Sequence, residues 1–188
     1  MAEVSSGLFL SDPLKIGRRL KDFSLKGVDG KKHSLSDFST RKILVVVFIS
    51  NNSKYSHAYN SRLVAIQNRF EEKGVQLICI NSNDDSYSIH DGFYKLVEQA
   101  RKHGYNFPYL KDSNQDVAKA FDAVCTPEAF VFDEHRVLRY RGRIDDNWSN
   151  PFAVKVNYIA RAIKEIFEGK VVSMSETTPF GDSIKWHF

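Results

Sequence analysis

Cysteine is scarce in this sequence, which limits the classes of protein to which it can belong. Cys79 and Cys125 are its only two cysteines, and a pair so far apart is not the dense disulfide framework of small secreted domains. The longest apolar run, residues 43–49, is far shorter than the roughly 20 residues that cross a bilayer. The first seven residues lack the basic-then-apolar build of a secretion signal. We therefore expect a cytoplasmic protein that does not enter a membrane.

Patterns that hold cofactors are also missing. The sequence has no glycine-rich phosphate loop, and none of its 6 histidines stands at metal-ligand spacing from a cysteine or a carboxylate. Its 27 Lys and Arg residues are interspersed with 23 Asp and Glu residues instead of forming a basic stripe. The sequence therefore predicts no cofactor, no metal and no nucleic-acid partner.

What is present is the composition of an ordinary globular protein. Apolar residues make up 42% and charged residues 27%, close to the averages of folded domains. A length of 188 residues suits one hydrophobic core. We expect a single domain over residues 1–188, with an irregular N-terminal segment at residues 1–15 and a C-terminal tail at residues 170–188.

Runs of apolar and β-branched residues predict the strands. Residues 43–49 are continuously apolar, which is typical of a central strand that is buried on both faces of a parallel sheet. Residues 75–80 predict the next strand, and residues 129–132 and 137–140 predict an antiparallel pair joined by a short turn. The dipeptide Asp29-Gly30 lies between two short alternating segments and predicts an N-terminal β-hairpin.

Apolar residues at helical spacing predict the helices. A long helix begins near Ser53 and ends at Gly74, and a second helix ends at Gly104. A third helix lies around residues 117–121, and residues 156–167 form the last one. Strands and helices in this order predict an α/β fold with a mixed central sheet, helices on both faces and an N-terminal β-hairpin.

The right-handed crossover rule sets the order of the central strands. It places the strand at residues 43–49 between the strands at residues 75–80 and 129–132. In this order the backbones of Cys79 and Cys125 lie about two strand spacings apart, which is too far for a disulfide. We therefore expect two free thiols.

Seven short stretches resemble one known family when their order and spacing are taken together. They are Phe23-Ser24-Leu25 with Asp29-Gly30-Lys31, Ser34-Leu35-Ser36-Asp37-Phe38, Phe48-Ile49-Ser50-Asn51-Asn52-Ser53, Ile80-Asn81-Ser82-Asn83-Asp84, Phe107-Pro108-Tyr109-Leu110, Cys125-Thr126-Pro127-Glu128 and Tyr140-Arg141-Gly142-Arg143-Ile144-Asp145-Asp146. They resemble the thioredoxin-like redoxin superfamily, and within it the thiol-disulfide oxidoreductase-like branch of the alkyl hydroperoxide reductase and thiol-specific antioxidant family. The resemblance covers nearly the whole chain. It implies a thioredoxin-like fold and an oxidoreductase of the thiol-disulfide or peroxiredoxin-like antioxidant type.

The chain departs from that family at the thiol positions. A Cys-Asn-His-Cys-Pro-like run of the branch aligns with Ser50-Asn51-Asn52-Ser53-Lys54, so serines stand where the resemblance places both catalytic cysteines. A Gly-Cys-Ser-Ile-Lys-Trp-like run in the tail aligns with residues 181–186, where Asp182 stands in place of a cysteine. The serines are either native to a paralog or replacements made against oxidation, and the aspartate favours the former. We therefore expect a redox-inert protein.

Serine chemistry agrees with this expectation. A hydroxyl stays protonated near neutral pH and attacks poorly unless a positioned base takes its proton. Ser53 is better interpreted as a helix N-cap. His57 follows Ser53 by four residues, but no orienting acid or oxyanion donor is evident, which favours a surface histidine over a hydrolytic Ser-His pair.

The resemblance also implies a substrate groove. In this family the proline of Thr126-Pro127 is cis and faces the catalytic positions, so that Asn51, Asn52, Thr126 and Pro127 would line the groove. The structural interpretation of the proline is a rigid turn into the next strand. The functional interpretation is an exposed backbone edge that pairs with an extended peptide, and the two are compatible.

Cys125 lies just before this turn and is the one thiol near the site. It is either a reactive thiol that forms a mixed disulfide or a small buried hydrophobe, as free cysteine commonly is. The second interpretation is favoured for Cys125. Cys79 lies within an apolar strand, where only the second applies.

Two alternatives to an inert protein therefore stay open. One is a weak one-thiol redox protein that uses Cys125, and the other is a non-catalytic peptide-binding module that uses the proline groove. The expected partner is a protein or peptide thiol, and the sequence does not specify an oligomeric state. Because the strand, the helix N-terminus and the proline turn are all expected, Ser50→Cys with Ser53→Cys should restore disulfide exchange, with Lys54 favouring the thiolate.

Overall fold

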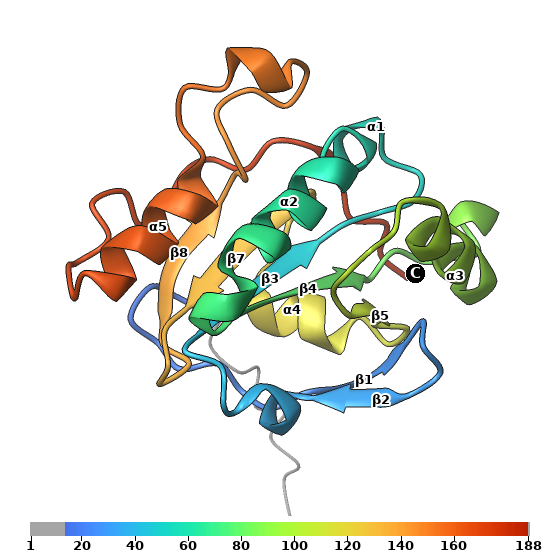
Figure 1. Ribbon diagram of the computed structural model, residues 1–188. Coiled ribbons are helices and arrows are strands. Elements are labelled where there is room, and N and C mark those ends of the chain that lie inside the picture. Colours follow the sequence, from blue (N-terminus) through green and yellow to red (C-terminus); the bar gives the residue numbers. More distant parts are fainter. Residues whose placement is uncertain (1–13, 188) are drawn as a thin grey trace, which may run out of the picture.

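A mixed sheet of seven strands, in the order β2-β1-β5-β4-β3-β7-β8, forms the centre of the molecule (Figure 1). The structure is a computed structural model that describes residues 14–187. The strands of this sheet are β1 (Ser24–Gly27), β2 (Lys32–Ser34), β3 (Ile43–Phe48), β4 (Val75–Asn81), β5 (Tyr109–Lys111), β7 (Glu128–Phe132) and β8 (Leu138–Gly142). The helices are α1 (Lys54–His57), α2 (Asn60–Phe70), α3 (Phe93–Lys102), α4 (Asp116–Phe121) and α5 (Tyr158–Phe167). Residues 1–13 of the expected irregular segment lie outside the described residues.

The strand order around β3 confirms the prediction. β3 runs parallel to β4, with Val47 opposite Cys79, and antiparallel to β7, with Val47 opposite Ala129. β7 and β8 form the predicted antiparallel pair. β1 and β2 form the predicted N-terminal hairpin, in which Gly30 has a φ of 81°, a conformation that glycine adopts freely.

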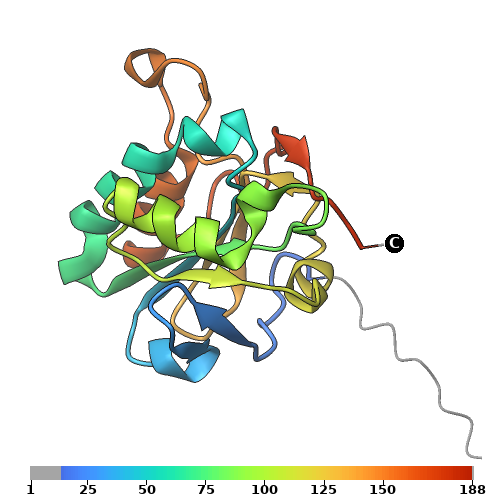
Figure 2. The same cartoon turned by 90° about the vertical axis from the view of Figure 1, so that its right-hand side faces the viewer.

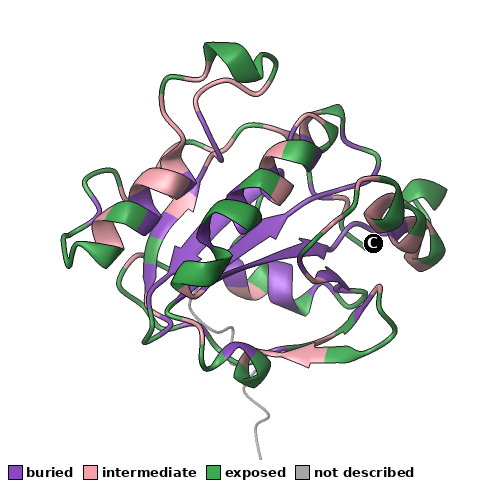
Figure 3. Ribbon diagram, in the orientation of Figure 1, coloured by how far each residue is buried: buried purple, intermediate pink, exposed green. Residues whose placement is uncertain are grey.

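Each face of the sheet has its own hydrophobic core, because alternate residues of a strand point to opposite faces. On one face, Val45 and Leu77 pack with the apolar sides of α2, α3 and α5. On the other face, Val46 and Ile78 pack against α4 and against residues 14–23. Figure 3 shows the central strands in the colour of buried residues, with helices on both sides. The expected fold class is therefore observed.

The long helix expected from Ser53 is in fact two helices. α1 is a single turn that ends at His57, and α2 begins at Asn60. Between them the Tyr59 amide donates to the Ser56 carbonyl at 3.0 Å, a three-residue spacing that tightens the chain. The apolar period continues across this break, so the sequence pattern alone does not reveal it.

Three short strands have no sequence pattern that predicts them. β5 joins the sheet between β1 and β4. β6 (Cys125–Thr126) and β9 (Asp182–Ser183) form a separate antiparallel pair, and Figure 2 shows β9 as the red arrow near the C-terminal end of the chain. The tail expected at residues 170–188 is thus attached to the domain, and its Val172 and Ile184 are buried.

Candidate functional site

The two serines at the expected catalytic positions lie where the central strand meets the first helix. Ser50 follows β3 and is 3% exposed, and Ser53 precedes α1 and is 1% exposed. The Ser53 hydroxyl accepts a hydrogen bond from the Ser56 amide at 3.3 Å, so Ser53 is the N-cap of α1, as predicted. The same hydroxyl donates to the Thr126 carbonyl at 3.2 Å, which links the helix start to the proline turn.

A buried carboxylate holds Ser50 in place. Asp91 is 1% exposed, and the Ser50 hydroxyl lies 3.0 and 3.1 Å from its two oxygens. The Asn51 amide also donates to Asp91 at 2.8 Å, and the side-chain amides of Asn81 and Asn83 donate at 2.7 and 3.0 Å. Hydrogen bonds from several donors offset the cost of removing a carboxylate from water.

Lys111 adds a cation to this network. Its ammonium donates to the Asn81 side-chain oxygen at 3.2 Å and to the carbonyls of Asn83 and Asp91 at 2.7 and 2.9 Å. Burial lowers the pKa of Lys111, and nearby carboxylates oppose that change. We refer to Ser50, Asn81, Asn83, Asp91 and Lys111 as the polar cluster.

The two asparagines between the serines differ in burial. Asn51 is buried, and its side-chain oxygen accepts a hydrogen bond from the Tyr109 hydroxyl at 2.9 Å. Asn52 is exposed. His57 is exposed, and its Nε2 donates a hydrogen bond to the Asn51 carbonyl at 2.7 Å, so Nε2 carries a proton. The Ser53 hydroxyl donates to the Thr126 carbonyl and not to His57.

The proline turn brings Cys125 next to the serines but keeps its thiol covered. The Thr126–Pro127 peptide bond is cis, and Cys125 is 7% exposed. Burial raises the pKa of the Cys125 thiol to about 12, and the carboxylates of Glu128 and Asp182 add to this effect. Burial likewise raises the pKa of Cys79, and both cysteines are unpaired.

The backbone beside the proline is not the exposed edge that one interpretation of the sequence expects. β9 pairs antiparallel with β6, with Ser183 opposite Cys125 and Asp182 opposite Thr126. The tail of the same chain therefore covers this edge. The sequence gives no local signal for the pairing, because the two partners are two-residue strands more than fifty positions apart.

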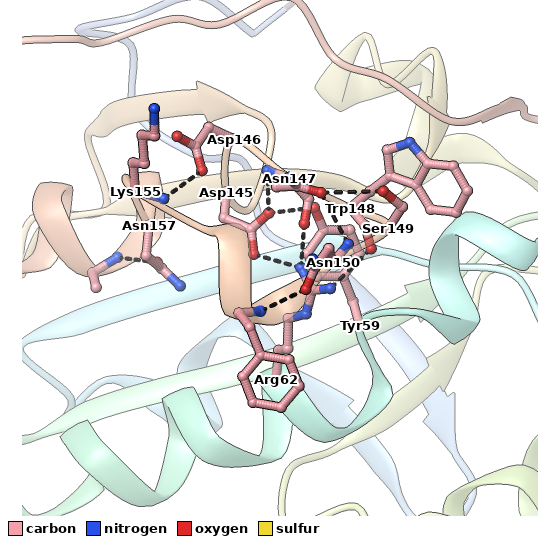
Figure 4. Close-up of polar contacts among 12 residues, drawn as sticks. Tyr59, Arg62, Asp145, Asp146, Asn147, Trp148, Ser149, Asn150, Lys155 and Asn157 are labelled. Atoms are coloured by element: carbon pink, nitrogen blue, oxygen red, sulfur yellow. Dashed lines mark hydrogen bonds and ion pairs between the residues drawn. The ribbon is translucent and has the colours of Figure 1, made fainter.

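A second polar network anchors the loop beside the site (Figure 4). Asp145 is 2% exposed and accepts hydrogen bonds from the Tyr59 hydroxyl at 2.7 Å and from Arg62 at 2.8 Å. Arg62 also donates to the carbonyls of Asn147 and Trp148 at 2.7 and 2.9 Å. Burial and the Asp145 carboxylate raise the pKa of Tyr59. These bonds tie the loop after β8 to α2.

Aromatic side chains from three segments meet near this loop. The ring of Tyr55 in α1 lies 4.6 Å from that of Trp148 and 5.1 Å from that of Phe180. The Lys54 ammonium lies 5.9 Å from the centre of the Trp148 ring. The helix start, the loop and the tail are therefore in contact beside the proline turn.

Asp91 and Lys111 are members of the site that were not predicted from the sequence. One usable signal was present, because Asn81 ends a strand parallel to the one that precedes Ser50, and Asn83 follows it closely. The carboxyl ends of parallel strands meet at the same edge of a sheet. Asp91 had no such signal, since it ends an isolated turn of 3-10 helix that carries no periodic pattern.

Residues 16–141 match the AhpC/TSA family, which is more than half of the 188-residue chain. The chain belongs to the AhpC/TSA family. None of the curated proteins matches it.

Solved structures share the fold of this chain. A hypothetical protein from Sinorhizobium meliloti 1021 is 32% identical, with a TM-score of 0.87 and coverage of 94% of this chain and 97% of that chain. An uncharacterized conserved protein from Geobacillus kaustophilus is 35% identical, with a TM-score of 0.87 and coverage of 94% and 95%. Peroxidoxin BcpB from Mycobacterium tuberculosis is 20% identical over 68% of this chain and 84% of that chain, and its TM-score of 0.58 shows a shared fold.

The AhpC/TSA match ends before the tail, yet the tail completes the site. Ser53 donates to the Thr126 carbonyl and Asp182 is paired with the same residue. Positions 53 and 182, two of the three where the resemblance places thiols, therefore meet at Thr126. The third position, Ser50, is linked to the tail by Asn83, whose side chain bonds both the Ser50 hydroxyl and the Lys185 amide.

Among residues 14–187, no three His, Cys, Asp or Glu side chains gather in a way that could hold a metal ion. The described helices include none that is long and apolar enough to cross a membrane.

Proposed function

We propose that this AhpC/TSA-family chain is a redox-inert thioredoxin-like protein, in which Ser50 and Ser53 hold the site together instead of exchanging disulfides. The observation that carries the proposal is that both hydroxyls already donate and accept hydrogen bonds within the protein. Ser50 donates to Asp91 and accepts from the Asn52 amide and the Asn83 side chain, each at 3.0 Å. Ser53 caps α1.

Neither hydroxyl is arranged as a nucleophile. Attack by a serine needs a base that takes its proton and a path for the substrate. Ser50 is 3% exposed, and its proton faces a carboxylate that already accepts other hydrogen bonds. The proton of Ser53 faces the Thr126 carbonyl, which is not a base.

The one-thiol alternative has little chemical support. Disulfide exchange and peroxide reduction both require a thiolate. A pKa of about 12 keeps the Cys125 thiol protonated at neutral pH, and the paired tail covers its backbone. We retain a protein or peptide thiol as the proposed partner. We also retain the cytoplasm as the proposed location, because two unpaired cysteines are compatible with a reducing compartment.

Turnover assays test the proposal directly. Wild type is compared with the double variant Ser50→Ala/Ser53→Ala and with Cys125→Ser, in the reduction of a disulfide-bonded peptide by dithiothreitol and in the consumption of hydrogen peroxide. All three rates are expected to equal the rate without protein. A wild-type rate above that of the double variant contradicts the proposal. A rate that only Cys125→Ser removes supports the one-thiol alternative instead.

The variant Ser50→Cys/Ser53→Cys distinguishes two reasons for a lack of activity, namely the missing cysteines and a substrate groove that has changed. The sequence predicts restored exchange because it predicts the strand, the helix N-terminus and the proline turn, but α1 is a single turn and the Ser50 hydroxyl lies 3.0 Å from the Asp91 carboxylate. A carboxylate so close raises the pKa of a thiol. We expect the double variant to form a 50–53 disulfide, and added Asp91→Asn to accelerate exchange. If the variants fold and exchange no disulfides, the groove has diverged and the chain is a binding module.

A further inference from the structure

The backbone beside the proline turn is bonded by one segment of the chain itself. We call the backbone of residues 124–126 the Thr126 edge, and residues 181–187 the strap. Within the described residues, β6 pairs with β9 and with no other strand. The Ile184 amide extends the pairing by donating to the Val124 carbonyl at 3.2 Å. The strap thus lies on the Thr126 edge as an added strand.

The closest approach is at Gly181. A Cβ atom at this position would lie 2.2 Å from the Thr126 carbonyl oxygen and 3.0 Å from the Pro127 nitrogen. Both contacts are to backbone atoms, which cannot rotate away as a flexible side chain does. The strap can therefore lie on the Thr126 edge only with a residue that has no side chain at position 181.

Beyond β9, the strap is bonded to residues around the polar cluster. The Lys185 amide donates to the Asn83 side chain at 3.0 Å, and the Lys185 carbonyl accepts from the Asp84 amide at 2.8 Å and from the Gln115 side chain at 2.7 Å. Ile184 is 3% exposed and packs in the core. Backbone pairing combined with a few selective side-chain positions is how an extended peptide binds to a sheet edge.

We propose that the strap is a built-in occupant of the Thr126 edge, the peptide-pairing edge that the family resemblance implies, and that it must leave before an extended partner can bind there. The strap defines the partner: an extended protein segment with glycine at the place of Gly181 and an aliphatic residue three positions later, at the place of Ile184. The attachment is suited to release, because β9 has only two residues. Such binding is independent of whether the serine site exchanges disulfides.

The strap competes with any such partner for the same backbone groups. The apparent dissociation constant of the partner is its intrinsic value divided by the fraction of molecules in which the edge is free. A substitution that raises this fraction should therefore lower the apparent dissociation constant by the same factor.

Gly181→Ala in the full chain is the test, and Ser183→Ala is its matched control. Ser183 lies in the same strand with an exposed side chain, so its replacement leaves the backbone pairing intact. The probe is a fluorescent peptide with the sequence of residues 178–187, together with a version in which alanine replaces its glycine. We expect Gly181→Ala to bind the first peptide at least about tenfold more tightly than wild type, the control to match wild type, and neither protein to bind the alanine version.

Hydrogen exchange and a second variant make the result decisive. In Gly181→Ala the Ile184 amide should lose protection, and a protected Ile184 with unchanged peptide affinity overturns the proposal. A chain that ends at residue 180 should fold and bind the same peptide. The proposal is also overturned if that shorter chain fails to fold, if it folds and does not bind, or if the Gly181→Ala protein forms dimers by exchanging tails instead of binding the peptide.

Discussion

At the scale of single residues, the site depends on buried polar groups that each make several bonds. Asp91 accepts from Ser50, Asn51 and two asparagine side chains. Glu128 is 0% exposed and accepts from the Val124 amide at 2.8 Å and from Arg141 at 3.1 Å. Burial raises the pKa of Glu128, and these hydrogen bonds lower it. The cost of removing these carboxylates from water is offset only by their full set of hydrogen bonds. Loss of one buried acceptor should therefore lower the free energy of unfolding more than loss of an exposed ion pair does.

Asp91→Asn tests this at the polar cluster. The amide nitrogen of the new side chain would face hydrogen-bond donors, so we expect the free energy of unfolding to fall by about 2–3 kcal/mol. The exposed neighbour Asp85→Asn should change it by less than about 0.5 kcal/mol. Urea denaturation followed by circular dichroism measures both values. Equal values for the two variants would show that the Asp91 network does not stabilise the fold.

The reactivity of Cys125 should depend on pH in a way that an activated thiolate would not. With a pKa of about 12, its thiolate fraction near pH 8 is about 10⁻⁴ and rises roughly tenfold per pH unit through pH 10. Alkylation by iodoacetamide should follow the same rise with no plateau, whereas a cysteine in an unstructured peptide levels off above about pH 9. A plateau near neutral pH would point to an activated thiol.

The same pKa gives the sign of a stability effect. The folded thiol holds its proton to higher pH than the unfolded one, whose model value is 9.0. Between pH 9 and about 12 the folded chain therefore binds more protons, and the contribution of Cys125 to stability is lost as pH rises through this range.

At the scale of elements, the loop between β8 and α5 is fixed at its base while its tip is exposed. Asp145 pairs with Asn157 across the base, and Arg62 of α2 bonds the loop backbone from below (Figure 4). Phe152 at the tip is 98% exposed. The position of Trp148 beside Tyr55 therefore depends on the pair between the partly buried Arg62 and the buried Asp145.

Arg62→Met should disturb this loop. It leaves the buried Asp145 without its cation, so we expect a loss of about 3 kcal/mol in the free energy of unfolding and faster proteolysis between residues 146 and 156. Arg69→Met on the same helix replaces an exposed arginine and should change stability by less than about 0.5 kcal/mol. Unchanged proteolysis in Arg62→Met would mean that other contacts hold the loop.

The lengths of the strands also show which of them can be predicted from a sequence pattern. β3 and β4 were predictable because they are six and seven buried residues long, and a strand buried on both faces is mostly apolar. β5, β6 and β9 have three, two and two residues, which is too short for a period. The serines were identified by resemblance. Asp91 was not, and the tail run at residues 181–186 was identified without its pairing to Thr126, because these bonds join residues distant in sequence and depend on the finished fold.

At the scale of the whole molecule, the two cysteines are buried by parts of the structure that should open in different ways. Cys79 lies in the central strand β4 at 0% exposure, whereas Cys125 lies under the two-residue strand β9 at the rim. Strands in the centre of a sheet open only with global unfolding, while segments held by few bonds open locally at lower free energy. The thiols should therefore differ in the opening that exposes them.

Alkylation in increasing urea measures this difference. The opening free energy from Cys79 should equal the global free energy of unfolding from circular dichroism and have the same urea dependence. The value from Cys125 should be smaller and nearly independent of urea at low concentrations, because release of the strap exposes little surface. Equal values for both thiols would mean that the strap opens only when the whole domain unfolds.

Because the strap follows every other helix and strand in the sequence, it is also synthesised after the residues that it covers. Every strand of the seven-stranded sheet ends by Gly142, and the residues that cover Thr126 begin at Gly181. A ribosome makes the N-terminal part of a chain first. Thr126 therefore leaves the ribosome before the strap does, and every nascent copy passes through a stage in which Thr126 has no strand beside it.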